Sequence, residues 1–137
     1  MTRTHRRRRD ESGQLAGIEV LPFGILVFVV GVLFFAQLWA VVSAKSSTES
    51  AAREATRTFV ESSGDVGAAA GNASGAAAEV LTSAGRSSSR ASIVPMTPLT
   101  LDRCATITFE VSYEVPVVAL PLISWGSGFT VRSSHTE

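Results

Sequence analysis

One uninterrupted run dominates the hydrophobic pattern of this chain. From Val20 to Ala44, 25 consecutive residues carry no formal charge, and large apolar side chains fall on every face of a helix drawn through them. Such a helix measures about 37 Å, and about 30 Å crosses the hydrocarbon core of a bilayer. A helix that is apolar on all sides belongs in lipid or in the core of a larger protein. Because 137 residues cannot supply that core, the run predicts a single transmembrane helix.

Helical periodicity continues beyond the apolar run. Small and apolar residues recur there at helical spacing and form one stripe, consisting of Ala44, Thr48, Ala51, Ala52, Ala55 and Phe59. Glu49 with Arg53, and Arg57 with Glu61, are opposite charges four residues apart, a spacing that supports a helix by about 0.2–0.5 kcal/mol per pair. The pattern predicts one helix over residues 14–61, whose part beyond the membrane forms a stalk.

Residues 62–91 are rich in alanine, glycine and serine. Ser74 is a candidate N-cap for a short helix over Gly75–Ala84, which Gly85 would end. The serines 87–89 are typical of a linker.

Period-two alternation replaces this pattern in residues 92–137. On one face of the predicted strand lie Ile107, Phe109, Val111, Tyr113 and Val115, with polar residues between them. Pro116 ends the strand, an apolar run over Val117–Ile123 leads to a turn at Gly126–Gly128, and Phe129–Arg132 is a candidate return strand. The sequence therefore predicts an α+β protein: a long N-terminal transmembrane helix continuing as a stalk, with a small antiparallel sheet at the C-terminal end lying against it.

Charge adds an orientation. The leader, residues 1–13, holds five arginines against Asp10 and Glu11, whereas only Lys45 precedes Arg53 on the other flank. Since basic residues favour the cytoplasmic side, we expect the N-terminus inside and the C-terminal part outside. The competing interpretation is a signal peptide cleaved after Ala44, against which stands an apolar stretch longer than the usual 7–15 residues. Twelve basic and twelve acidic residues argue against a nucleic-acid binder.

Two features of the apolar run are candidates for contacts with other proteins. Gly17, Gly24 and Gly31 recur every seven residues and lie along one slowly drifting stripe, where helices can approach closely; Ala36, Ala40 and Ala44 extend the small-residue theme. Glu19 is an ionisable group at the cytoplasmic edge of the run, where a partner or the headgroup region could accommodate it. Trp39 lies toward the outer end, as expected of an aromatic anchor.

The basic leader, a glycine, a glutamate and then a long apolar helix resemble the bacterial type IV pilin superfamily, in particular the TadE-like pseudopilins of tight-adherence pilus systems. The residues that carry the resemblance are Gly13-Gln14-Leu15-Ala16-Gly17-Ile18-Glu19 and, after the span, Ser50-Ala51-Ala52-Arg53-Glu54-Ala55. The resemblance implies leader cleavage between Gly13 and Gln14, and pairing of Glu19 with the new amine of a neighbouring subunit. Glu19 is the sixth residue after Gly13, one later than the superfamily's usual fifth, so cleavage and an intact leader both stay open.

The function that the resemblance implies is structural. We expect a minor pilin or pseudopilin of a Tad-type pilus assembly or secretion system, in the bacterial cytoplasmic membrane, with the bilayer and other pilin-like subunits or assembly proteins as partners. The alternative is a secreted or membrane-anchored surface binding module unrelated to pili.

Catalytic chemistry is not expected. Cys104 is the only cysteine, and the two histidines, His5 and His135, lie near opposite termini, so neither a zinc site nor a nucleophile–base pair can be assembled. No phosphate-binding loop or hydrolase elbow is present. The sequence predicts no cofactor, metal or small-molecule substrate. For Cys104 it favours a buried, apolar role over an intermolecular disulfide.

Overall fold

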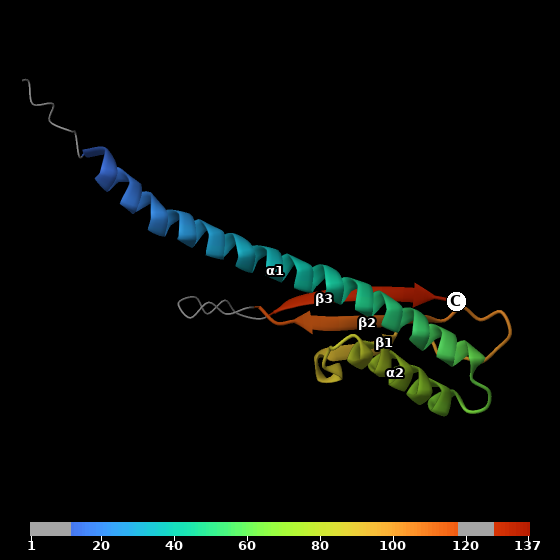
Figure 1. The fold of residues 1–137 in the computed structure, drawn as a ribbon. Helices are drawn as coiled ribbons and strands as arrows, with labels where there is room; N and C mark the ends of the chain where they lie inside the picture. The colour runs from blue at the N-terminus through green and yellow to red at the C-terminus, as the bar shows by residue number, and fades with distance from the viewer. Residues whose placement is uncertain (1–11, 118–127) are drawn as a thin grey trace, which may run out of the picture. The chain divides into compact units, whose positions relative to one another are not determined.

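The computed structural model describes residues 12–117 and 128–137, with side chains described from Val20 onward. Helix α1 runs over Ser12–Glu61, 50 residues, and a small antiparallel sheet follows it (Figure 1). The predicted α+β class is thus confirmed. The chain divides into two compact units, Met1–Ala36 and Gln37–Glu137. Residues 1–11 of the predicted leader lie outside the described residues.

The first unit, where described, is the N-terminal half of α1. Pro22 lies inside the helix. Twelve large apolar side chains between Val20 and Phe35 are 47–73% exposed. The helix is long and apolar enough to cross a membrane, and none of its most apolar window is buried.

The second unit contains a three-stranded meander in the order β1-β2-β3. The strands are β1 (Ala91–Pro95), β2 (Thr108–Val115) and β3 (Phe129–Thr136). Both neighbouring pairs are antiparallel, and Val111 of the central strand lies opposite Ile93 on one side and Ser133 on the other. The alternation of buried and more exposed residues along β2 confirms the strand prediction. The return strand is also confirmed and is longer than predicted. The intervening apolar run and glycine turn fall almost entirely within residues 118–127, outside the described residues.

The prediction for residues 62–91 was wrong about the start of the helix and about the serine segment. Helix α2 spans Val66–Ser83, and its N-cap is Asp65, whose carboxylate accepts a hydrogen bond from the Ala68 N–H at 3.0 Å; Ser74 lies in mid-helix. The buried side of α2 explains the extra length, since Ala69, Ala73, Ala77 and Leu81 recur every four residues. Burial of that stripe offsets the cost of three helical glycines, about 1 kcal/mol each.

The predicted stop at Gly85 is confirmed. Gly85 adopts a positive φ of 73°, and its N–H donates to Thr82 O while that of Arg86 donates to Leu81 O, both at 2.9 Å. These bonds form the Schellman motif that commonly ends helices at glycine. The predicted serine linker is instead structured, because the 3-10 helix η1 (Ser88–Arg90) leads directly into β1.

The core lies between two layers, the sheet and a pair of helices formed by α2 and the C-terminal half of α1 (Figure 1). Alanines of both helices are buried in it, which allows close approach. Phe59 of α1 packs on Phe109 of β2 with ring centroids 5.7 Å apart. Every residue of the stripe predicted on the stalk is at most 1% exposed, and its packing against β2 confirms that the sheet lies on this helix.

A second, smaller cluster of buried residues marks the point along α1 where the sheet begins to cover the apolar run. Ala44 is buried against Tyr113, Val115 and Val131, with Ala40 and Val41 packed beside it. Assigning Ala40 and Ala44 to contacts with other transmembrane helices was therefore wrong, because their small side chains let the protein's own sheet approach. The 20 residues from Val20 to Trp39 precede this cluster, a helical length of about 30 Å.

Candidate functional site

The predicted processing and pairing residues all lie on α1. Gly13 and Gln14 are in its first turn, and Gly17 and Glu19 follow in the same helix. For these four residues only the backbone is described, so their roles stay predictions.

The other two glycines of the predicted stripe are described fully. A methyl group built at Gly24 or Gly31 would meet no atom within 4 Å. Neither glycine is therefore needed for packing within the described part of the chain, which leaves their surface open to another molecule.

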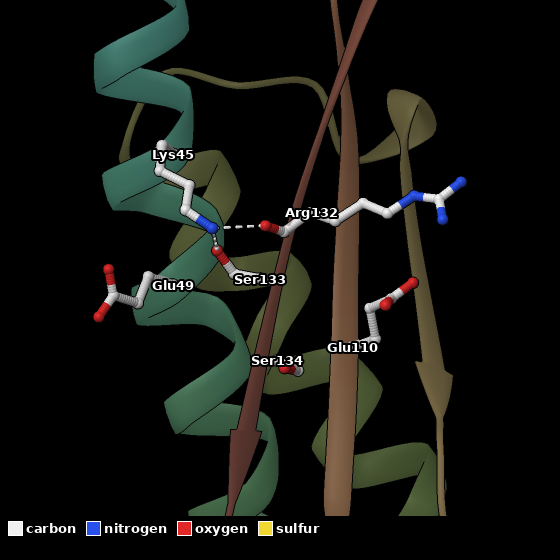
Figure 2. A pocket seen from close by; sticks show the side chains of 6 residues that line it. All are labelled: Lys45, Glu49, Glu110, Arg132, Ser133 and Ser134. Atoms are coloured by element: carbon white, nitrogen blue, oxygen red, sulfur yellow. Dashed lines mark hydrogen bonds between the residues drawn. The ribbon is translucent and has the colours of Figure 1, made fainter.

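The helix and the sheet of the second unit are joined by polar contacts from α1 to β3. Lys45 Nζ donates to Arg132 O at 2.5 Å and to Ser133 Oγ at 2.9 Å. Figure 2 shows this ammonium group reaching from the helix to the strand, while the Arg132 side chain extends away from it. In the sequence, Lys45 stands out only as a charge that flanks the apolar run and as the single lysine of the chain.

Two buried threonines continue these contacts along α1. Thr48 Oγ1 lies 3.3 Å from Ser133 Oγ, and Thr56 Oγ1 lies 3.3 Å from His135 O. Each hydroxyl also donates to a helix carbonyl, of Lys45 and Ala52 respectively. The helix carbonyls partner these hydroxyls in any register, whereas the contacts with Ser133 and His135 form only in this one and so favour it.

A polar pocket of about 240 Å³ lies beside Lys45. The residues that line it are Lys45, Glu49, Glu110, Arg132, Ser133 and Ser134 (Figure 2). Its lysine is held by β3, and Glu49 pairs with Arg53. Two of the four charged side chains in the described lining, Lys45 and Glu49, are therefore already engaged in contacts within the protein.

Both predicted ion pairs on the stalk are present. Arg53 pairs with Glu49, and Arg57 Nε lies 2.8 Å from Glu61 Oε1. The hydrogen bond to Glu61 raises the pKa of the Arg57 guanidinium above its ordinary value. All four side chains are well exposed, so the pairs contribute little to stability.

The expectation that Cys104 is buried was wrong. Its thiol is free and exposed, and its backbone has a positive φ of 68°. It lies in the connection between β1 and β2, where the turn holds it outside the core, beside a pocket of about 270 Å³ that Phe59 and Ile107 also line. The second unit therefore carries an exposed thiol that a reagent can label.

A second basic group, which sequence analysis missed, follows α2. The Arg86 guanidinium lies 5.2 Å from the centroid of the Tyr113 ring, a cation–π contact. One terminal nitrogen reaches Ala40 O at 3.5 Å, and the buried Nε has no acceptor among the described residues. Arg86 and Tyr113 are 27 positions apart in the sequence, and no local pattern pairs them.

Among the described residues, no group of three or more His, Cys, Asp or Glu side chains could hold a metal ion. No family model, curated protein or solved structure matches this chain. A functional assignment therefore depends on its residues and geometry.

Proposed function

We propose that this protein is a single-span structural component of the bacterial cytoplasmic membrane, a TadE-like minor pilin or pseudopilin that works in Tad-type pilus assembly or secretion. Its N-terminal helix packs laterally against other pilin-like subunits or assembly proteins, with the N-terminus in the cytoplasm and the sheet outside. The protein acts as a scaffold, without catalysis.

One observation carries this proposal: α1 has two halves with opposite surroundings. From Ala44 to Phe59 one face is buried against the protein's own α2 and sheet. From Val20 to Phe35 large apolar side chains are exposed all round. Leaving so much apolar surface in water costs about 25 cal/mol per Å², so lipid and neighbouring helices are its natural surroundings. The open surface at Gly24 and Gly31 supports helix contacts.

The exposed thiol provides a direct test of topology. In spheroplasts, a membrane-impermeant maleimide is expected to label Cys104 without permeabilisation, because the thiol is exposed and the proposal places it outside. The measurement is the mass shift of the purified chain, and Cys104→Ser is the control for thiol specificity. Labelling only after the membrane is opened would overturn the proposed orientation.

N-terminal sequencing of the same material identifies processing. A start at Gln14 marks leader cleavage. A start at Lys45 marks removal of a signal peptide, which would contradict the proposed membrane anchor.

The proposed subunit contact is tested at Glu19. Glu19→Ala is expected to reduce recovery of partner pilins in co-purification while leaving membrane insertion intact, since removing a carboxylate from an apolar helix eases insertion. Glu79→Ala removes an exposed carboxylate from α2 and serves as the matched control. Equal partner recovery with both variants would leave Glu19 as a residue of the headgroup region without a pairing role.

A further inference from the structure

A pocket of about 520 Å³ lies at the start of the second unit. It is formed by the first turns of α1 within that unit, the residues after α2 and the end of β2. Its polar and aromatic lining residues are Gln37, Arg86, Ser87, Arg90 and Tyr113. Gln37 Nε2 donates to Pro116 O at 3.4 Å, which ties α1 to the end of the strand here.

The charged residues that line this pocket are all positive. Its described lining includes two arginines and no carboxylate. Arg86 is held in place by the Tyr113 ring, and its buried Nε has no acceptor among the described residues. The Arg90 side chain is exposed and takes part in no ion pair with the described residues. Two guanidinium groups with no carboxylate partner among the described residues favour an anion, and the planar donor fork of arginine matches phosphate oxygens.

The position of the pocket in the sequence indicates which anion. Its α1 residues flank Trp39, which is 76% exposed and ends the 20-residue uncovered apolar stretch. Tryptophan at the end of such a stretch is typical of the membrane–water interface, where lipid headgroups lie. Basic side chains near an anionic surface are attracted to those headgroups.

We propose that the Arg86–Arg90 pocket binds the phosphate of an anionic phospholipid at the outer surface of the cytoplasmic membrane. This inference rests on the proposed membrane insertion and adds a lipid partner to it. Stacking on Tyr113 gives Arg86 a structural role as well. Arg90 makes no such contact with Tyr113, so the single variant at Arg90 tests lipid binding without removing the stacking contact.

The test uses the full-length protein in nanodiscs made of equal parts phosphatidylcholine and phosphatidylglycerol. Native mass spectrometry of the released protein measures which lipid stays bound. The wild type is expected to retain phosphatidylglycerol preferentially. Arg90→Gln should lower this preference about fivefold, and the Arg86→Gln/Arg90→Gln double variant should lower it by about that factor again. Arg103→Gln removes an exposed arginine that lines a different pocket, and it should leave the preference unchanged.

The remaining outcomes separate the alternatives. Equal retention of both lipids by the wild type, or an equal loss with Arg103→Gln, would overturn the site while leaving membrane insertion standing. Inorganic phosphate that binds the wild type but not Arg90→Gln, with no preference of the wild type between the two lipids, would also overturn it, in favour of a free-phosphate site. If the wild type does not enter nanodiscs, both this inference and the proposed anchor fail. An unchanged circular dichroism spectrum and melting temperature for Arg90→Gln show that the fold is intact in the decisive comparison.

Discussion

Introducing arginine at both Val27 and Val30 is expected to abolish membrane insertion of the full-length chain. Each arginine costs about 2.5–3.5 kcal/mol at the centre of a transmembrane helix. The twelve large apolar side chains between Val20 and Phe35 favour insertion by about 4–7 kcal/mol together. One arginine offsets part of this favourable free energy of insertion, and two arginines offset most or all of it. The measurement is the fraction of protein that stays in the membrane after alkaline carbonate extraction.

The matched control makes the same change at two exposed valines of the second unit. Val60 and Val94 are 52% and 46% exposed, similar to Val27 and Val30, but lie outside the uncovered apolar stretch. Val60→Arg/Val94→Arg should remain in the membrane fraction. If the Val27→Arg/Val30→Arg chain stayed there too, the apolar half of α1 would not be a membrane anchor.

Replacing Phe59 by alanine is expected to destabilise the second unit by about 3–5 kcal/mol. Phe59 is 1% exposed and packs on Phe109 at the centre of the core, so its removal leaves a cavity between the helices and the sheet. Whole domains are stable by only about 5–15 kcal/mol. Hydrogen exchange of the β2 amides, measured on the full chain in nanodiscs, reports the free energy of opening.

Phe129→Ala is the matched control, because Phe129 is 58% exposed at the start of β3. Exposed positions usually change stability by no more than about 0.5 kcal/mol. Equal effects of the two variants would contradict the assignment of Phe59 to the core.

Sequence patterns with a strict period predicted their elements well. The alternation from Ile107 to Val115 specified both the strand and its buried face, because successive side chains of a strand point to opposite sides. The stripe from Ala44 to Phe59 likewise identified the face of α1 that packs on the sheet. In both cases local periodicity and tertiary burial agree.

The remaining features depend on contacts that no local pattern contains. The extent of α2 depends on alanine burial against distant strands, and glycine content pointed the other way. The exposure of Cys104 follows from a turn with positive φ, which its residue type does not predict. The Arg86–Tyr113 contact requires the end of α2 to meet β2. For the proposed pairing of Glu19, the partner belongs to another molecule, so a single chain cannot test it.

The attachment of α1 to the sheet also has a mechanical consequence. Packing and hydrogen bonds extend from Ala40 to Phe59, with polar contacts to β3 at Lys45, Thr48 and Thr56. A force along the axis of this packed half loads these contacts in parallel, as shear, so they must yield together. A force across the axis opens them in sequence, beginning at Ala40. The second unit is therefore expected to withstand a larger force along the axis of its helix than a force that separates the helix from the sheet starting at Ala40.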